Sequence, residues 1–322
     1  MTGRPATPSP PAPVATAELD QQLTALGRIL VTGAGGMIGS TVVDRLLRAG
    51  AEVTALDTGY PNGTGADRLV SGDATDVDVV AGALADVAAV VHLGAIPTPN
   101  GADAYTVFRN NTDSTFNVLG QAADRGVRRA VIASSINATG IPFNPHAEPP
   151  AYFPIDEDLP IDLADAYSLS KQVDEHTART LWRATGIDVV AFRFPLTAPA
   201  ARLGEAAAHQ REDPGYAVRE GWSYLDVRDA AEAVCLALVR PLSGVHVLCL
   251  CAPDNLAGLD AAELLRQFAP DVDVREPITG TATLYSARRA GELLGWRARY
   301  VRAWETEATS STGIDADLRT DR

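Results

Sequence analysis

Short apolar runs alternate with amphipathic stretches along most of this chain. The periodic patterns between the runs, at residues 40–48, at 115–125 and around Lys171, predict helices. Strands that alternate with helices indicate a parallel sheet covered by helices on both faces, and strands that are apolar almost throughout fit a sheet buried on both sides. The sequence therefore predicts an α/β fold with a Rossmann-type doubly wound parallel sheet. Its strands are expected at residues 28–31, 52–56, 89–93, 130–134 and 188–193.

The regular pattern stops at both ends of the chain and in two internal segments. Residues 1–26, which begin with a run rich in Pro, Ala and Thr, and the acidic residues 305–322 predict a disordered leader and tail. Residues 140–164 and 196–222 lack a clear period, and loops this long commonly carry function. We expect a sheet domain over 27–195, to whose substrate side 140–165 contribute. A small C-terminal substrate-binding lobe is expected over 196–304, with 223–250 returning to the sheet.

Composition narrows the classes of function. The 322 residues are 46% hydrophobic, enough for one large α/β domain, and carry a net charge of −14 without a basic block, which argues against nucleic-acid binding. No apolar run approaches the roughly 20 residues of a membrane span, and no signal-peptide pattern is present. We therefore expect a cytoplasmic protein without a membrane partner. The cysteines are too few for a disulfide framework or a metal site, and two of them, Cys249 and Cys251, alternate as expected for core residues on one face of a strand.

A glycine-rich turn joins the first predicted strand to the first helix. Within residues 31–39, Gly33, Gly36 and Gly39 are spaced G-x-x-G-x-x-G. The first glycine permits a tight turn, the second lets the backbone approach a pyrophosphate, and the third lets the helix pack closely on the strand. The helix N-terminus then offers unpaired N–H groups to phosphates. A glycine turn without a ligand is the alternative, but the strand–turn–helix context favours dinucleotide binding.

Asp57 ends the second predicted strand. A carboxylate there can accept both hydroxyls of an adenosine ribose and repels the 2′-phosphate of NADP. The next arginine is Arg68, so the sequence favours NAD as the cofactor. Asp73 is expected near the adenine ring. Both residues are also common turn formers, which is the structural alternative.

Tyr167 and Lys171 are the centre of the chemical argument. At positions i and i+4 of a helix they share one face, and Lys171 is the only lysine in the chain. A phenol has a pKa near ~10, and a neighbouring ammonium together with a positive nicotinamide favours the phenolate that a base needs. Lysine can also hydrogen-bond a ribose hydroxyl. A Tyr and a Lys on a helix surface are the alternative.

Two further polar residues are candidates for the same site. Ser135 follows the strand at 130–134, and strand ends of a parallel sheet face the ligand crevice, so its hydroxyl could hold a substrate oxygen beside Tyr167. Ser134 competes for this role. Asn111 could orient the site through its amide or could cap the following helix.

These motifs resemble those of the NAD-dependent epimerase/dehydratase family, the extended short-chain dehydrogenases, over residues 28–304. The resemblance extends to residues 91–95, to 222–230 and to the Leu-Gly-Trp at 294–296. It implies a Ser-Tyr-Lys mechanism in which Tyr167 takes a hydroxyl proton while the substrate carbon passes hydride to NAD, and a structural role for His92. The implied catalytic residues are Ser135, Tyr167, Lys171 and Asn111. The implied cofactor-binding residues are Gly33, Gly36, Met37, Ile38, Gly39, Asp57, Asp73, Ala74, Leu93, Ala95, Asn111, Tyr167, Lys171 and Pro195.

Departures from the family pattern bear on the substrate. Family dehydratases carry an Asp-Glu pair where this chain has Ile136 and Asn137, which argues against water loss. Residues 92–96 and 134–140 resemble the uronate-dehydrogenase branch, but that branch has Ser where this chain has Pro97, and His in place of Asn137 or Ala138. Together with Ser135 and Asn137, Arg202 is a candidate substrate contact, because it could meet a carboxylate or a phosphate. A solvated surface arginine is the alternative.

Three functions fit the sequence. The favoured one is an NAD-dependent dehydrogenase acting on a secondary alcohol of a sugar or a sugar-like compound. The second is a nucleotide-sugar epimerase that keeps its NAD bound. The third is a non-enzymic NAD sensor, which has no reason to keep Ser135, Tyr167 and Lys171 together. The family often pairs into dimers, and here the helices of Thr115 and Lys171 are the candidates for a homodimer interface.

Overall fold

The computed structural model describes residues 14–61 and 63–307. Within them, seven parallel strands form one sheet in the order β10-β7-β5-β4-β1-β2-β3, which confirms the doubly wound fold. Most strands are buried on both faces, whereas exposure alternates along β3 at the edge, so β3 lacks the apolar run that marks the others. The strands are β1 (Arg28–Thr32), β2 (Val53–Asp57), β3 (Arg68–Ser71), β4 (Val87–His92), β5 (Arg129–Ser135), β7 (Asp188–Phe194) and β10 (Val245–Cys249).

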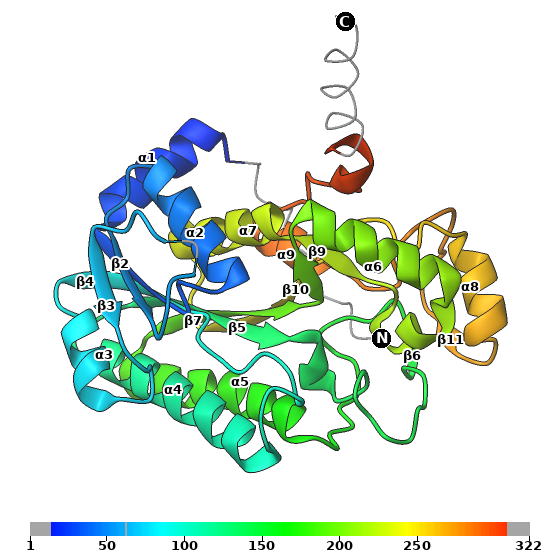
Figure 1. Cartoon of the computed structure of the whole chain (residues 1–322), viewed down its shortest axis with the longest axis horizontal. Coiled ribbons are helices and arrows are strands. Elements are labelled where there is room, and N and C mark those ends of the chain that lie inside the picture. The colour runs from blue at the N-terminus through cyan, green and yellow to red at the C-terminus, as the bar shows by residue number, and fades with distance from the viewer. Residues whose placement is uncertain (1–13, 62, 308–322) are drawn as a thin grey trace, which may run out of the picture.

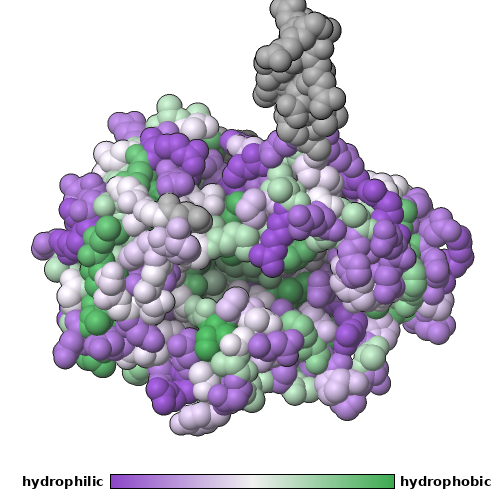
Figure 2. All heavy atoms as spheres, in the orientation of Figure 1, coloured by the Kyte–Doolittle hydropathy of each residue, from purple (hydrophilic) through white to green (hydrophobic). Residues whose placement is uncertain are grey.

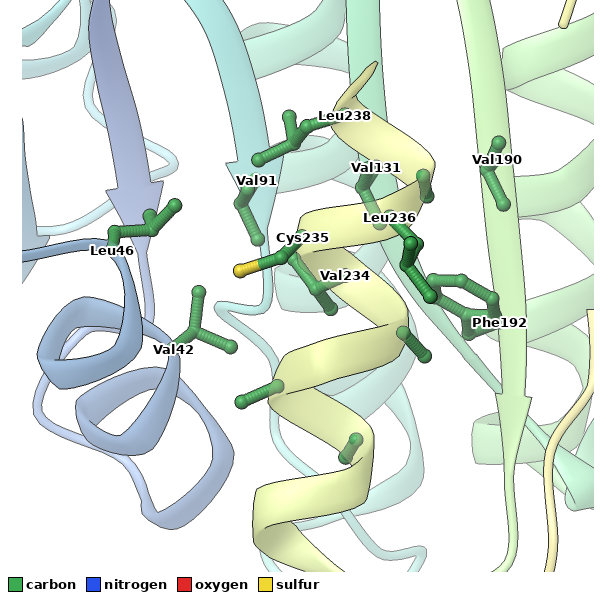
Figure 3. Close-up of a cluster of buried hydrophobic side chains, with 14 of the residues drawn as sticks. Val42, Leu46, Val91, Val131, Val190, Phe192, Val234, Cys235, Leu236 and Leu238 are labelled. Atoms are coloured by element: carbon green, nitrogen blue, oxygen red, sulfur yellow. The ribbon is translucent and has the colours of Figure 1, made fainter. Parts of the chain in front are cut away.

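Helices cover both faces of the sheet, as Figure 1 shows. On one face lie α1 (Thr16–Leu26), α2 (Met37–Arg48), α7 (Val227–Val239) and α9 (Arg288–Leu294); on the other lie α3 (Val77–Ala83), α4 (Ala104–Asp124) and α5 (Ala166–Thr185). Figure 3 shows α7 packing its apolar side chains between α2 and the sheet. Cys235 is part of this core, and its burial raises the pKa of the thiol to about 12, so the thiol stays neutral.

The N-terminal segment corrects one prediction. Residues 16–26, expected within a disordered leader, form α1, and residues 1–13 lie outside the described residues. Leu19 and Leu23, one helical turn apart, are fully buried in the core that α2 and α7 share. Asp20 of the same helix pairs with Arg45 of α2 at 2.8 Å. A buried face of two leucines is too small to stand out in the sequence.

A smaller lobe lies beside the C-terminal ends of the strands. It contains α6 (Ala200–Glu212), the 3-10 turns η1 (Ile136–Thr139) and η2 (Pro214–Glu220), and α8 (Ala261–Phe268). Two short parallel pairs, β6 (Tyr152–Phe153) with β11 (Asp273–Val274) and β8 (Leu196–Ala198) with β9 (Tyr224–Asp226), complete it. The expected break in regular structure over 196–222 is therefore wrong, because most of that segment is β8, α6 and η2.

Three other boundaries differ from the predictions. The helix expected at 115–125 begins eleven residues earlier, at Ala104, where the side chain of Asp103 caps its N-terminus. The strand expected to hold both Cys249 and Cys251 ends at Cys249, although both thiols are buried as expected. Residues 305–307, expected within a disordered tail, are helical, and Glu307 pairs with Arg228; the rest of the predicted tail, 308–322, lies outside the described residues.

The topology fixes the position of a ligand crevice. The order of strands reverses between β1 and β4, and ligands of such sheets bind outside the carboxyl ends of the strands at this point. Figure 2, in the orientation of Figure 1, shows a hollow near the middle of the molecule, with apolar residues on its floor.

Candidate active site

The glycine turn after β1 forms one wall of the crevice. Gly33 has a φ of +67°, and a Cβ there would lie 2.6 Å from the backbone nitrogen of Gly94, so only glycine fits between the ends of β1 and β4. Gly36 occupies the N-cap position of α2, and no side chain caps that helix. The first N–H groups of α2 are therefore left for a ligand, and Met37 and Ile38 line the cavity in front of them. This uncapped N-terminus fits a pyrophosphate.

A cavity of about 460 Å³ extends from this turn over the ends of β2 and β3. The carboxylate of Asp57 accepts hydrogen bonds from the backbone nitrogens of Gly35, at 2.9 Å, and Gly59, at 3.1 Å, which hold it at the cavity wall. Asp73 is held by the backbone nitrogen of Thr75 at 2.8 Å and lines the same cavity. Its walls thus combine a fixed carboxylate with the glycine turn, as the adenosine half of NAD requires.

A second cavity of about 520 Å³ adjoins the first and shares Gly33, Gly36, Leu93 and Ala95 with it. Tyr167 and Lys171 of α5 line it, and both are almost fully buried. The Lys171 Nζ lies 5.9 Å from the centre of the Tyr167 ring. The structure therefore brings the predicted phenol and ammonium to one wall of a cavity that continues from the glycine turn.

Lys171 is held from two sides. Its Nζ donates to the carbonyl oxygen of Ala133 at 3.0 Å and to Asp174 Oδ2 at 3.1 Å. Burial lowers the pKa of Lys171, but Asp174, Tyr167 and Glu175 together raise it above its ordinary value, so the ammonium stays charged. An ammonium has three donors, and the third is left for a ligand such as a ribose hydroxyl. Asp174 is a residue that sequence reasoning missed.

The two serines at the end of β5 have different surroundings. Ser134 Oγ donates to Glu175 Oε1 at 2.7 Å, and the same carboxylate pairs with Arg193 at 2.9 Å. The Ser134 hydroxyl is thus committed to a buried ion pair that joins α5 to β7. Ser135 Oγ instead accepts hydrogen bonds from the backbone nitrogen and the Nδ2 of Asn137, both at 3.1 Å. Its own hydrogen is left to donate into the cavity, which favours Ser135 over Ser134.

Asn111 lies apart from the cavities. It is buried in the middle of α4, so the expectation that it caps a helix is wrong. Its Nδ2 donates to the Ile96 carbonyl and to Ser170 Oγ, both at 3.1 Å, and its Oδ1 accepts from the Ile96 nitrogen at 2.8 Å. Asn111 therefore ties the loop after β4 to the turn of α5 that carries Tyr167, and this geometry fits the orienting role proposed from the sequence rather than contact with the reactants.

His92 has two threonine partners inside the protein. Its Nδ1 lies 2.7 Å from Thr32 Oγ1 and its Nε2 lies 3.2 Å from Thr115 Oγ1. Burial, reinforced by the nearby Lys171, lowers the pKa of His92 to about 3, so the ring stays neutral. His92 does not line either cavity, which supports the structural role that the family resemblance implied.

The predicted set comes together almost completely. Asn111 is the one member that lies behind the cavity walls. The lobe adds Glu220 and Thr197, which were not among the predicted site residues. Arg202 of α6 is exposed at the second cavity. The predicted residues that line the two cavities are Gly33, Gly36, Met37, Ile38, Gly39, Asp57, Asp73, Ala74, Leu93, Ala95, Ser135, Asn137, Tyr167, Lys171, Pro195 and Arg202.

Comparison with known proteins identifies the class. Residues 29–249 match the model of the NAD dependent epimerase/dehydratase family, and the chain belongs to that family. It is therefore an NAD-dependent enzyme of the short-chain dehydrogenase/reductase type, and its cofactor is NAD. None of the helices within residues 14–61 and 63–307 combines the length and apolar character needed to cross a membrane.

Individual relatives differ in their reactions. The chain is 27% identical to a UDP-glucose 4-epimerase of Azospirillum brasilense, over 92% of this chain and 97% of that protein. It is 30% identical to an NAD-dependent glucose-6-phosphate dehydrogenase of Haloferax volcanii, over 52% of this chain and 67% of that protein. A solved short-chain dehydrogenase/reductase superfamily protein of Agrobacterium tumefaciens with bound NAD superposes with a TM-score of 0.69 at 26% identity, covering 91% of this chain and 100% of that one.

Proposed function

We propose that this protein is an NAD-dependent dehydrogenase that oxidises a secondary alcohol of a sugar or a sugar-like compound. The observation that carries the proposal is the meeting of Ser135, Tyr167 and Lys171 on one cavity that continues from the glycine turn. The absence of an Asp-Glu pair after Ser135, where the chain has Ile136 and Asn137, argues against dehydration.

The three side chains have different tasks in the proposed reaction. Ser135 donates its free hydrogen to the substrate oxygen and holds it beside Tyr167. Tyr167 takes the hydroxyl proton at its Oη. Lys171, fixed by the Ala133 carbonyl and Asp174, stabilises the negative charge of the phenolate and offers its third hydrogen to a ribose hydroxyl. NAD held along the glycine turn and Asp57 would supply the acceptor for the hydride of the carbinol carbon. The buried position of Tyr167 limits competing proton exchange with water.

The experiment measures whether NAD stays bound to the purified protein, because a dehydrogenase must release its cofactor after each turnover. We expect the purified protein to carry little NAD after denaturation and to reduce added NAD when it is given the correct member of a panel of free sugars. Stoichiometric retained NAD, with no net reduction by any sugar, would contradict the proposal.

A nucleotide-sugar epimerase is the second candidate. The full-length similarity to the UDP-glucose 4-epimerase of Azospirillum brasilense favours it. An epimerase returns the hydride to the same substrate, so it gains from NAD that is never released. The retained-cofactor measurement therefore separates the two candidates, and conversion of UDP-glucose to its 4-epimer without accumulation of NADH would establish the second.

We also propose that α4 and α5 form the interface of a homodimer. Phe116, Ile161 and Leu169 are 59%, 52% and 43% exposed, and together with Val173 they line a shallow apolar hollow along α4 and α5. Burial of such side chains against a second copy is favourable. Light scattering coupled to gel filtration should give twice the chain mass, and Leu169→Glu should give the mass of a monomer.

A further inference from the structure

The outer part of the second cavity is built by the lobe. Thr197 of β8, Arg202 of α6 and Glu220 of η2 line it, whereas Tyr167 and Lys171 line the part next to the glycine turn. Glu220 is the only carboxylate among the described residues that line this cavity. Its surroundings indicate what kind of substrate group the cavity accepts.

The Glu220 carboxylate has no hydrogen-bond or ion-pair partner among the described residues. The nearby guanidinium of Arg219 attracts it electrostatically but donates its hydrogen bond elsewhere, to the Asn144 carbonyl at 2.7 Å. Burial raises the pKa of Glu220, and Arg219 offsets this only in part. Glu220 is only partly buried, and it faces the cavity. A ligand that displaces the remaining water must therefore donate hydrogen bonds to this carboxylate, or binding carries the cost of desolvating it.

The backbone after Glu220 fixes the position of this residue. Gly221 and Trp222 have φ values of +60° and +51°, and a Cβ on Gly221 would lie 2.7 Å from the Leu284 carbonyl oxygen. Trp222 is completely buried, and its indole donates to the Pro214 carbonyl at 2.8 Å. The Leu284 nitrogen donates to the Gly221 carbonyl at 3.1 Å. A non-glycine residue in the left-handed region persists only when its surroundings enforce it, so the lobe holds this turn rigidly.

The side-chain oxygen of Asn137 is a second hydrogen-bond acceptor without a partner among the described residues. The Nδ2 of Asn137 donates to Ser135 Oγ, but its Oδ1 is buried and has no partner within the described part of the chain. Asn137 lines the cavity together with Glu220. Because this oxygen has almost no accessible surface, the acceptor that the cavity offers to a ligand is the Glu220 carboxylate.

We propose that Glu220 selects the substrate by accepting hydrogen bonds from a donor group, a pair of hydroxyls or a protonated amine, and by excluding carboxylate and phosphate groups from that position. The inference rests on the proposed function and narrows its substrate class to neutral or amino sugars.

The charges of the cavity support this assignment. Its cationic lining residues among those described are Lys171 and Arg202. Asp174 already neutralises Lys171, and Arg202 is exposed to solvent, which screens its charge. An anionic group next to Glu220 would therefore meet a partly buried like charge with little compensation, whereas a hydroxyl or an ammonium would satisfy the carboxylate.

The test measures binding separately from turnover. The parent is Tyr167→Phe loaded with NAD, which keeps the cavity but cannot take the proton, and the ligands are glucose, glucosamine, glucuronate and UDP-glucose, titrated by calorimetry. We expect glucose or glucosamine to bind at least about tenfold more tightly than glucuronate and UDP-glucose. Adding Glu220→Gln should raise the dissociation constant of the better ligand about 10- to 100-fold and reduce the difference in affinity between that ligand and glucuronate. A larger loss for glucosamine than for glucose identifies an ammonium as the donor, and equal losses identify hydroxyls.

The control and the contrary outcomes are defined in the same assay. Glu212→Gln, at an exposed glutamate at the end of α6, should leave every dissociation constant unchanged, and NAD should bind all variants equally. The proposal fails when glucuronate or UDP-glucose is the best ligand, or when no ligand of the panel binds. It also fails when Glu220→Gln changes the ratios between the ligands' dissociation constants by less than twofold. Binding that depends on Glu220, without oxidation by the unmodified enzyme, would refute the proposed function and leave this inference standing.

Discussion

The two parts of the second cavity are built on opposite principles. Next to the glycine turn the charge of Lys171 is compensated inside the protein by Asp174 at 3.1 Å, and behind the cavity wall Arg193 pairs with Glu175 at 2.9 Å. In the outer part the Glu220 carboxylate has no hydrogen-bond or ion-pair partner in the described chain. A group that supports a reaction by its charge, such as Lys171, must keep one geometry and one charge state, which a buried ion pair provides. Groups that choose a substrate are left for the substrate to satisfy.

Among the groups that position and charge the site, the largest effect is expected at Lys171. Lys171→Arg keeps the positive charge, but the larger planar guanidinium cannot occupy the space between the Ala133 carbonyl, Asp174 and Tyr167. We expect kcat to fall by about 100-fold or more, the range that positioned acid–base catalysis contributes. Steady-state kinetics with the sugar found in the panel checks this. Near-normal kcat would show that a positive charge alone suffices and that the position of the Lys171 Nζ between the Ala133 carbonyl and Asp174 is unnecessary.

Asp174→Asn tests whether internal compensation fixes the charge of Lys171. Removing one partner of a buried ion pair should lower the free energy of unfolding by about 3 kcal/mol. In the parent protein Asp174 opposes the effect of burial on the pKa of Lys171. Without this carboxylate, burial would lower the pKa, and the ammonium would lose its proton at lower pH. The alkaline decline of kcat against pH should therefore move to lower pH.

The groups that face this pair come from several elements. They are Tyr167 and Glu175 on α5, His92 on β4 and Arg193 on β7. None of them is changed by the substitution. Asp44→Asn, at an exposed position of α2, is the matched control and should alter neither stability nor the pH profile. An unchanged alkaline limit in Asp174→Asn would argue that Asp174 has only a packing role.

His92 gives a smaller effect that depends on pH. The folded-state pKa of about 3 lies below the ordinary value of 6.5, so between these values the unfolded chain binds a proton that the folded protein does not. Stability from this residue is present above pH 6.5 and decreases as the pH falls, by about 2 kcal/mol at pH 5. Urea unfolding at pH 7.5 and pH 5 should show this loss of stability. In His92→Gln the loss between the two pH values should be smaller by the contribution of His92. Equal pH dependence in both proteins would mean that His92 becomes protonated in the folded state.

The compensated part of the site was largely predictable from the sequence, and the outer part was not. Gly33, Asp57, Tyr167 and Lys171 follow strands or share a helix face, so local spacing places them. Glu220 reaches the cavity through a turn held by Leu284, which lies far along the chain, and no local pattern reports such a contact.

Errors in the predicted fold have similar physical causes. The helix α1 was missed because Leu19 and Leu23 alone make its buried face, within a segment that begins with Pro and Ala. The helix α6 buries mainly small residues, together with Leu203, and therefore shows little apolar period. Asp174 resembles a solvated helix residue in the sequence, since only the tertiary structure shows that it is buried against Lys171.

Turnover by Tyr167→Phe tests the central claim most directly, because this substitution removes only the hydroxyl that takes the proton. With NAD and the preferred sugar, kcat should fall by about 1,000-fold, while the dissociation constant for NAD changes little because the glycine turn and Asp57 are untouched. A variant that binds NAD normally and still oxidises the sugar at nearly the original rate would contradict the assignment of Tyr167 as the proton acceptor.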